Sequence, residues 1–164
     1  MIKKNININF YLLLGLIILS FLLRFVTVYF VRDIAIGNEW NILIDNLVKF
    51  KSYSLYTFDN QLIPSVYMPP MYPFFIYLIK IITSFEGDNL IHLIIFIQII
   101  LSTYSVYVFY QLNQNFFSEK LSLINSFIFS FVPLNLYVCG QISSINLQII
   151  FSLLFLKFFL LIIK

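Results

Sequence analysis

The chain has 164 residues, of which 61% are hydrophobic, 20% are aromatic and only 10% are charged. Soluble domains carry roughly a quarter charged residues, so this deficit, together with long apolar runs, predicts an integral membrane protein. A formal net charge of +3 is too small and too dispersed to indicate nucleic-acid binding, and the single cysteine, Cys139, excludes an internal disulfide and a multi-cysteine metal site.

The first apolar block runs from Phe10 to Val31 and is interrupted only by Arg24. As a helix rising about 1.5 Å per residue it reaches roughly 33 Å, which is enough to cross the hydrocarbon core. Lys3 and Lys4 ahead of it favour a cytoplasmic N-terminus. No small-x-small cleavage site follows the block, so we expect a retained first span rather than a cleaved signal peptide.

The next segment, residues 34–50, has the period of an amphipathic helix. Its apolar residues recur at i, i+3, i+4 and i+7: Trp40, Leu43, Ile44, Leu47 and Val48. Its polar residues occupy the opposite face: Asn38, Asn41, Asp45 and Lys49. Such a helix lies at the membrane surface instead of crossing the membrane. The polar, Tyr-rich residues 52–65 that follow read as a loop or a short hairpin.

A proline-rich element, YMPPMYP at residues 67–73, precedes a short apolar stretch. The stretch over 71–85 would be roughly 22 Å long as a helix, which is too short for a comfortable span. Prolines suit its start, because the first N–H groups of a helix have no partner there. We expect a juxtamembrane or re-entrant helix. The alternative is a short true span, which would invert the topology of everything downstream.

Three further apolar blocks, at residues 90–112, 121–138 and 145–163, complete the predicted architecture. With the first span at 10–31 they predict an all-α membrane protein of four transmembrane helices, in which an external loop over 32–89 carries the juxtamembrane helices. Six of the seven acidic residues fall in that loop: Asp33, Glu39, Asp45, Asp59, Glu86 and Asp88. The predicted location is the inner or plasma membrane.

This order of elements resembles the polytopic GT-C glycosyltransferases, in particular their protein-mannosyltransferase and aminoarabinose-transferase-like branch. The matching segments are NEW at 38–40, DNL at 45–47, KSYS at 51–54, MPPMYPFF at 68–75 and PLNLY at 133–137. The likeness covers most of residues 10–150, and PPxYP is its most specific piece. It implies a fold of many transmembrane helices, an active site on the non-cytoplasmic face and a polyprenyl-phosphate-linked sugar as donor.

The resemblance also implies an acidic catalytic base in the first external loop. That role falls to Glu39, with Asp33 as the second candidate. The family usually shows an acidic pair followed by Tyr, whereas here Ile36 occupies the first acidic position and Trp40 follows Glu39 directly. A carboxylate at the membrane surface could take the proton of an acceptor hydroxyl beside the donor phosphate. The alternative for Glu39 is an acid that only stabilises the helix dipole.

The candidate residues for binding the substrate or the lipid phosphate are Arg24, Pro69, Pro70, Tyr72, Gln141 and Ser143. Arg24 is costly inside a span and is therefore a candidate for the donor phosphate, with snorkelling to the surface as the alternative. Met68 stands where relatives carry Lys or His, which puts a phosphate contact there in question. The sequence assigns no metal ligand and no certain cofactor, and it leaves a divalent-metal requirement open.

Two other functions remain open, a transporter or flippase component and a non-catalytic membrane subunit. Transporters tend to show inverted repeats and Gly- or Pro-broken spans with charges at the midplane, and the sequence shows neither clearly. The family is normally much longer than this chain, so we expect a truncated gene product or an incomplete sequence, which would be inactive alone. The sequence does not identify the sugar, the acceptor or the oligomeric state.

Overall fold

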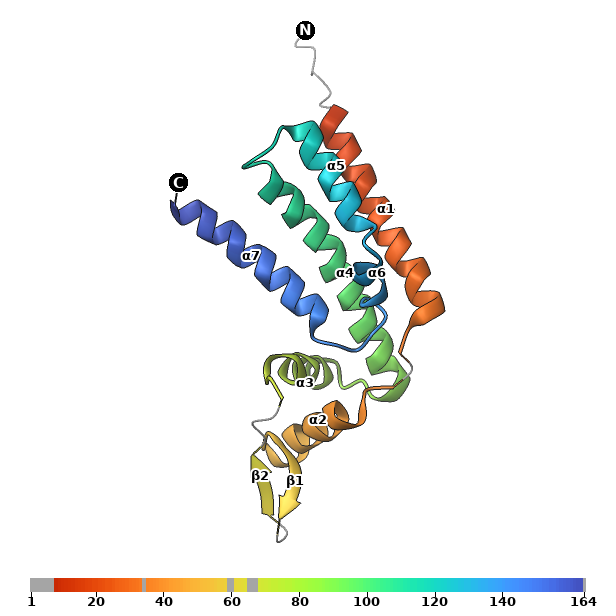
Figure 1. Cartoon of the computed structure of the whole chain (residues 1–164). Helices are drawn as coiled ribbons and strands as arrows, with labels where there is room; N and C mark the ends of the chain where they lie inside the picture. The colour runs from red at the N-terminus through yellow and green to blue at the C-terminus, as the bar shows by residue number, and fades with distance from the viewer. Residues whose placement is uncertain (1–7, 34, 59–60, 65–67, 164) are drawn as a thin grey trace. The chain divides into compact units, whose positions relative to one another are not determined.

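A computed structural model describes residues 8–33, 35–58, 61–64 and 68–163 (Figure 1). Its elements, in chain order, are α1 (Ile8–Val31), α2 (Asn38–Phe50), β1 (Ser54–Phe58), β2 (Gln61–Pro64), α3 (Met71–Thr83), α4 (Gly87–Asn113), α5 (Glu119–Ser130), α6 (Pro133–Tyr137) and α7 (Ile145–Ile163). The predicted helical membrane fold is confirmed, with one small antiparallel hairpin, β1–β2, as its strands.

Three helices among the described residues are long and apolar enough to cross a membrane: α1 over Asn9–Val31, α4 and α7. The chain is therefore an integral membrane protein. The α3 helix has 13 residues, so it is only about 20 Å long. This length agrees with the expected juxtamembrane or re-entrant helix.

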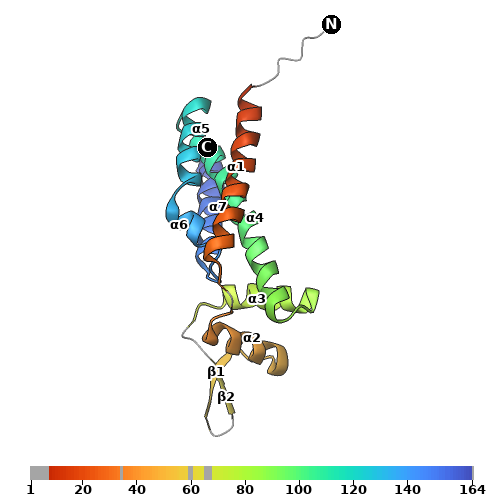
Figure 2. The ribbon, with the colours of Figure 1, turned by 90° about the vertical axis from the view of Figure 1, so that its right-hand side faces the viewer.

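The described chain divides into two compact units. The span unit comprises Met1–Arg32, Gln98–Gln141 and Ile145–Lys164. The hairpin unit comprises Asp33–Ile97 and Ile142–Ser144, and it contains α2, α3 and the β-hairpin. Within the span unit, α1, α4 and α5 run side by side in both views (Figures 1 and 2).

The region 121–138 forms two helices instead of the single expected one. The α5 helix ends at Ser130, and the five-residue α6 begins at Pro133. Proline has no N–H, so it cannot continue the hydrogen bonding of the helix before it, but it fits the first position of a new helix. Because of this break, α5 alone has 12 residues, too few to cross a membrane as one helix.

The broken segment nevertheless runs the whole length of α1. At one end, Asn9 Nδ2 donates to Glu119 Oε2 at 2.7 Å, and at the other, Gln141 Nε2 donates to the Val31 carbonyl at 2.8 Å. The segment from α5 to Gln141 therefore follows the same direction and reach as α1. In chain order it comes after α4 and before α7, and we call it the third pass of the span unit.

The backbone at Gly140 lies very close to the backbone at the C-terminal end of α1. A Cβ atom at Gly140 would lie 2.9 Å from the Val31 carbonyl oxygen and 3.1 Å from Arg32 Cα. Both neighbours are backbone atoms, which cannot move aside as a flexible side chain can. Glycine at this position is what lets the chain after α6 reach the end of α1 and lets Gln141 cap the Val31 carbonyl.

In the hairpin unit, α2 and α3 pack through their apolar faces. Leu43 and Ile44 of α2, and Ile76 of α3, are fully buried. The amphipathic helix expected over 34–50 is thus present over Asn38–Phe50, and its apolar face is covered by protein. Asp45, which the periodicity places on the water face, forms an ion pair with Lys80 of α3 at 3.0 Å.

Replacing Gly140 with Ala should lower the free energy of unfolding by about 1–3 kcal/mol, because the new methyl group would overlap backbone atoms of α1. The matched control is Gly15→Ala in α1, where nothing lies within 4 Å of the added Cβ. That control should be neutral or slightly stabilising, since Ala is the better helix former. Denaturant titration in detergent, followed by circular dichroism, measures both; equal stability of the two variants would contradict the close approach.

The two ends of α4 should lie on opposite sides of the membrane, since this helix has 27 residues. Single cysteines at Asp88 and Gln114, in a Cys139→Ala background, can be labelled with an impermeant maleimide in sealed vesicles. We expect Asp88 to react from the external side and Gln114 from the cytoplasmic side. Labelling of Asp88 from the cytoplasmic side alone would show that the predicted orientation is wrong.

Candidate functional site

The residues predicted for the site fall into both units. Arg24 and Gln141 belong to the span unit, whereas the other candidates belong to the hairpin unit: Asp33, Glu39, Pro69, Pro70, Tyr72 and Ser143.

The hairpin unit brings an acid and a buried phenol together. Asp33 follows α1, and its Oδ2 accepts the backbone N–H of Ile142 at 2.7 Å. Tyr72, in the first turn of α3, is 1% exposed. Burial, and then the nearby negative charge of Asp33, raise the pKa of Tyr72 above its usual value. The phenol of Tyr72 therefore stays protonated at physiological pH and remains a hydrogen-bond donor.

The proline-rich element places Tyr72 at the start of a helix. Pro69 and Pro70 are exposed, and the carbonyl of Pro70 accepts the N–H of Phe74 at 3.0 Å, which begins α3. On the other side, Trp40 of α2 packs edge-on against the Tyr72 ring, with ring centroids 5.3 Å apart and planes at 81°. This ring contact therefore brings together two of the segments that carry the family resemblance, NEW at 38–40 and PPxYP at 69–73.

Glu39 has different surroundings from Asp33. It lies in the first turn of α2 and is exposed, where a carboxylate interacts favourably with the helix dipole. Its neighbour Trp40 contacts Tyr72, while the Glu39 carboxylate takes part in none of the hydrogen bonds or ion pairs described for this part of the chain. The catalytic role assigned to Glu39 stays a prediction.

In the span unit, Arg24 is fully buried and does not snorkel. Its Nε donates to Ser102 Oγ of α4 at 2.8 Å, and its Nη1 donates to the carbonyl at 3.1 Å and to the hydroxyl of Ser20, one turn earlier in α1. Nη2 makes no hydrogen bond to any described group. A donor phosphate could reach this guanidinium only if α1 and α4 moved apart.

Sequence reasoning missed the polar groups that surround Arg24. Ser20, at i−4 on the same helix face, is the one that the periodicity could have identified. The other polar neighbours come from distant segments and carry no local signal: Ser102 and Cys139.

The two residues of the turn that were expected to line the site, Gln141 and Ser143, belong to different units and have different surroundings. The side chain of Gln141 caps the Val31 carbonyl, and its own backbone oxygen accepts Gln98 Nε2 at 3.0 Å. Gln141 therefore holds helices together within the span unit. Ser143, in the hairpin unit, has a buried Oγ that makes no hydrogen bond to a described group.

The Arg24 contacts lead to a stability prediction. Ser102→Ala removes the acceptor of a charged donor in a buried place, which should cost about 1.5–3 kcal/mol. The control is Ser126→Ala in α5, because this buried hydroxyl bonds only its own helix, at the Ser122 carbonyl. Its loss should cost about 1 kcal/mol or less. Unfolding titrations of both variants in one detergent compare the two costs, and equal losses would argue against the Arg24–Ser102 bond.

Within the described residues, no three His, Cys, Asp or Glu side chains gather into a group that could hold a metal ion. Comparisons of the chain with protein-family models, with curated proteins and with solved structures found no match.

Proposed function

We propose that this chain is part of a membrane glycosyltransferase that moves a sugar from a polyprenyl-phosphate carrier to an acceptor on the non-cytoplasmic face of the membrane. The observation that supports the proposal is that the Asp33 carboxylate lies near enough to the buried Tyr72 phenol for its charge to raise the pKa of that phenol. A carboxylate placed directly after the first span lies beside the tyrosine of the PPxYP element, and both belong to a unit built from short juxtamembrane helices.

The contacts of Asp33 suit a general base. Its Oδ2 is held by the Ile142 N–H, which fixes the carboxylate and leaves Oδ1 to accept a proton. In the proposed reaction this oxygen takes the proton of the acceptor hydroxyl as the hydroxyl oxygen bonds to the anomeric carbon. The bond from that carbon to the phosphate oxygen breaks, and polyprenyl phosphate leaves with the electron pair. These contacts favour Asp33 over the exposed Glu39 as the base.

Tyr72 supports the same chemistry as a neutral group. Its raised pKa keeps the hydroxyl protonated, so the group beside the candidate base is neutral rather than a second anion. The Trp40 ring holds the Tyr72 ring from one side. A lipid-linked donor keeps its phosphate at the interface, which is where juxtamembrane helices of the length of α2 and α3 belong.

A transporter or flippase component is the second candidate, and one observation favours it. The third pass is broken at Pro133, and a buried arginine lies in α1, a combination that is typical of transporters. However, the Arg24 guanidinium is enclosed by serine hydroxyls and a carbonyl, whereas a transport site needs groups that face a water-filled path.

Asp33→Asn keeps the shape of the side chain but removes proton acceptance. Sugar transfer should therefore fall by roughly 10²–10⁴-fold, while donor binding survives. The matched variant Glu39→Gln should retain transfer within about tenfold, because that carboxylate acts only on the helix dipole. The measurement is the transfer of radiolabelled sugar from polyprenyl-phosphate donors in membranes that contain the protein.

The two variants also separate the alternatives. Loss of transfer in Glu39→Gln with normal transfer in Asp33→Asn would move the base to Glu39. Normal transfer in both would remove the case for this site. Absence of transfer with every polyprenyl-linked donor, accompanied by movement of such a lipid between leaflets, would favour the flippase.

A further inference from the structure

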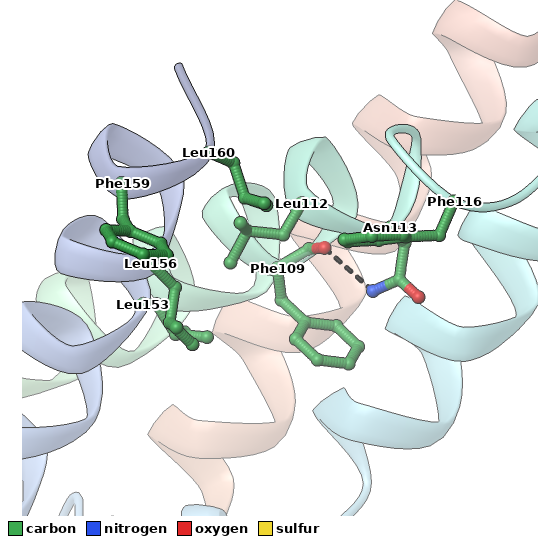
Figure 3. Close-up of a pocket in the computed structure, with 8 residues that line it drawn as sticks. All are labelled: Phe109, Leu112, Asn113, Phe116, Leu153, Leu156, Phe159 and Leu160. Atoms are coloured by element: carbon green, nitrogen blue, oxygen red, sulfur yellow. Dashed lines mark hydrogen bonds between the residues drawn. The ribbon is translucent and has the colours of Figure 1, made fainter. Parts of the chain in front are cut away.

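An apolar groove runs between α4 and α7 in the span unit (Figure 3). It encloses about 390 Å³ and is lined by seven apolar side chains and one amide: Phe109, Leu112, Asn113, Phe116, Leu153, Leu156, Phe159 and Leu160. Its volume is within the range of roughly 300–1,000 Å³ that is usual for small-molecule sites. The amide of Asn113 is turned to its own helix, where Nδ2 donates to the Phe109 carbonyl at 2.8 Å. The groove therefore offers an almost wholly apolar surface.

The groove lies alongside the packing of α7 on α4. Ile150 of α7 is buried with Val108 and Leu112 of α4, and Leu153, Leu154 and Leu160 of α7 pack against this cluster. Both helices are long and apolar enough to span a membrane, so the opening between them faces lipid rather than water.

A cation lies beside this groove. Lys157 shares a face of α7 with the groove residues Leu153 and Leu160, which are four residues before it and three after it. Its Nζ donates to Gln111 Oε1 of α4 at 2.7 Å and so joins the two helices. The side chain is only half-buried, and an ammonium group has three donors, so two remain for another partner.

The span unit does not supply the anion that Lys157 needs. Glu119 is the one carboxylate in the sequence of this unit, and it is already bound by Asn9 at 2.7 Å and Tyr110 at 3.4 Å. A charged group within an apolar span is expensive unless it is paired, and a neutral amide oxygen compensates only part of its charge. The positive charge of Lys157 therefore has no carboxylate partner among the described residues of the span unit, and it lies next to an apolar groove.

We propose that this groove, named here the α4–α7 groove, holds an acyl chain of an anionic phospholipid whose phosphate pairs with Lys157. An anionic lipid is the one partner that brings both an apolar chain and a negative headgroup from the bilayer itself. Lys157 is six residues from Ile163, the end of α7, or about 9 Å along the helix, and a lysine side chain can extend most of that distance toward the headgroups. This inference goes beyond the proposed sugar transfer and does not rest on it.

The test uses the quenching of a single tryptophan by brominated lipids. In a Trp40→Phe background, Phe159→Trp places a reporter in the α4–α7 groove, and Leu14→Trp places one on a lipid-exposed part of α1 at a similar distance from its helix end. The protein is reconstituted in phosphatidylcholine vesicles that contain dibrominated phosphatidylglycerol or dibrominated phosphatidylcholine. The ratio of the two quenching constants gives the preference for the anionic lipid at each reporter.

We expect the preference at Phe159→Trp to exceed that at Leu14→Trp by about fivefold, the effect of one basic side chain near a lipid phosphate. Adding Lys157→Gln should abolish the excess, Lys157→Arg should retain it, and Lys120→Gln, at the exposed start of α5, should leave it unchanged. Equal preferences at the two reporters would overturn the proposal, because Lys157 would then be paired with a protein carboxylate or with none. An excess that survives Lys157→Gln would overturn it as well.

Discussion

The hydrocarbon core supplies no water, so every polar group that enters it must find its partners within the chain. Arg24 is the strongest case, because a guanidinium inside the first span is costly unless the protein encloses it. Ser20 in the same helix and Ser102 in α4 provide oxygen acceptors, and their bonds join the first pass to the second. Small polar side chains, few of which are noticeable in the sequence, are therefore the groups on which the packing of the spans depends.

The same constraint explains why the third pass can be broken. The carbonyls at the end of α1 need donors, and the Gln141 side chain supplies one to Val31 only because α6 ends early and Gly140 allows a close approach. In the hairpin unit, the next residue of the chain, Ile142, donates its N–H to Asp33. Two consecutive residues of one loop therefore make these bonds. Gln141 donates to a carbonyl at the end of α1 in the span unit, and Ile142 donates to the candidate base Asp33 in the hairpin unit.

Sequence patterns predicted the elements whose signals are local. The apolar lengths of α1, α4 and α7 identified the spans, and the 3.6-residue period identified α2. Pro133 was visible, but its effect was underestimated, since the apolar run continues through it and hides the change from α5 to α6. The partners of Arg24 could not be predicted, because Ser102 is 78 residues away and no pattern links the two. The hydrogen bond from Ile142 to Asp33 could not be predicted for the same reason, because it joins residues 109 positions apart.

If the chain transfers sugar as proposed, a polyprenyl phosphate binds beside Asp33 and Tyr72. Photocrosslinking tests this in membranes, with a polyprenyl phosphate that carries a diazirine next to its phosphate, followed by mass spectrometry of the labelled peptides. We expect labelling of the peptide after α1 that contains Asp33 and of the peptide at the start of α3 that contains Tyr72, with competition by unlabelled polyprenyl phosphate. Labelling spread along the exposed faces of the spans, or labelling that the competitor does not reduce, would contradict it.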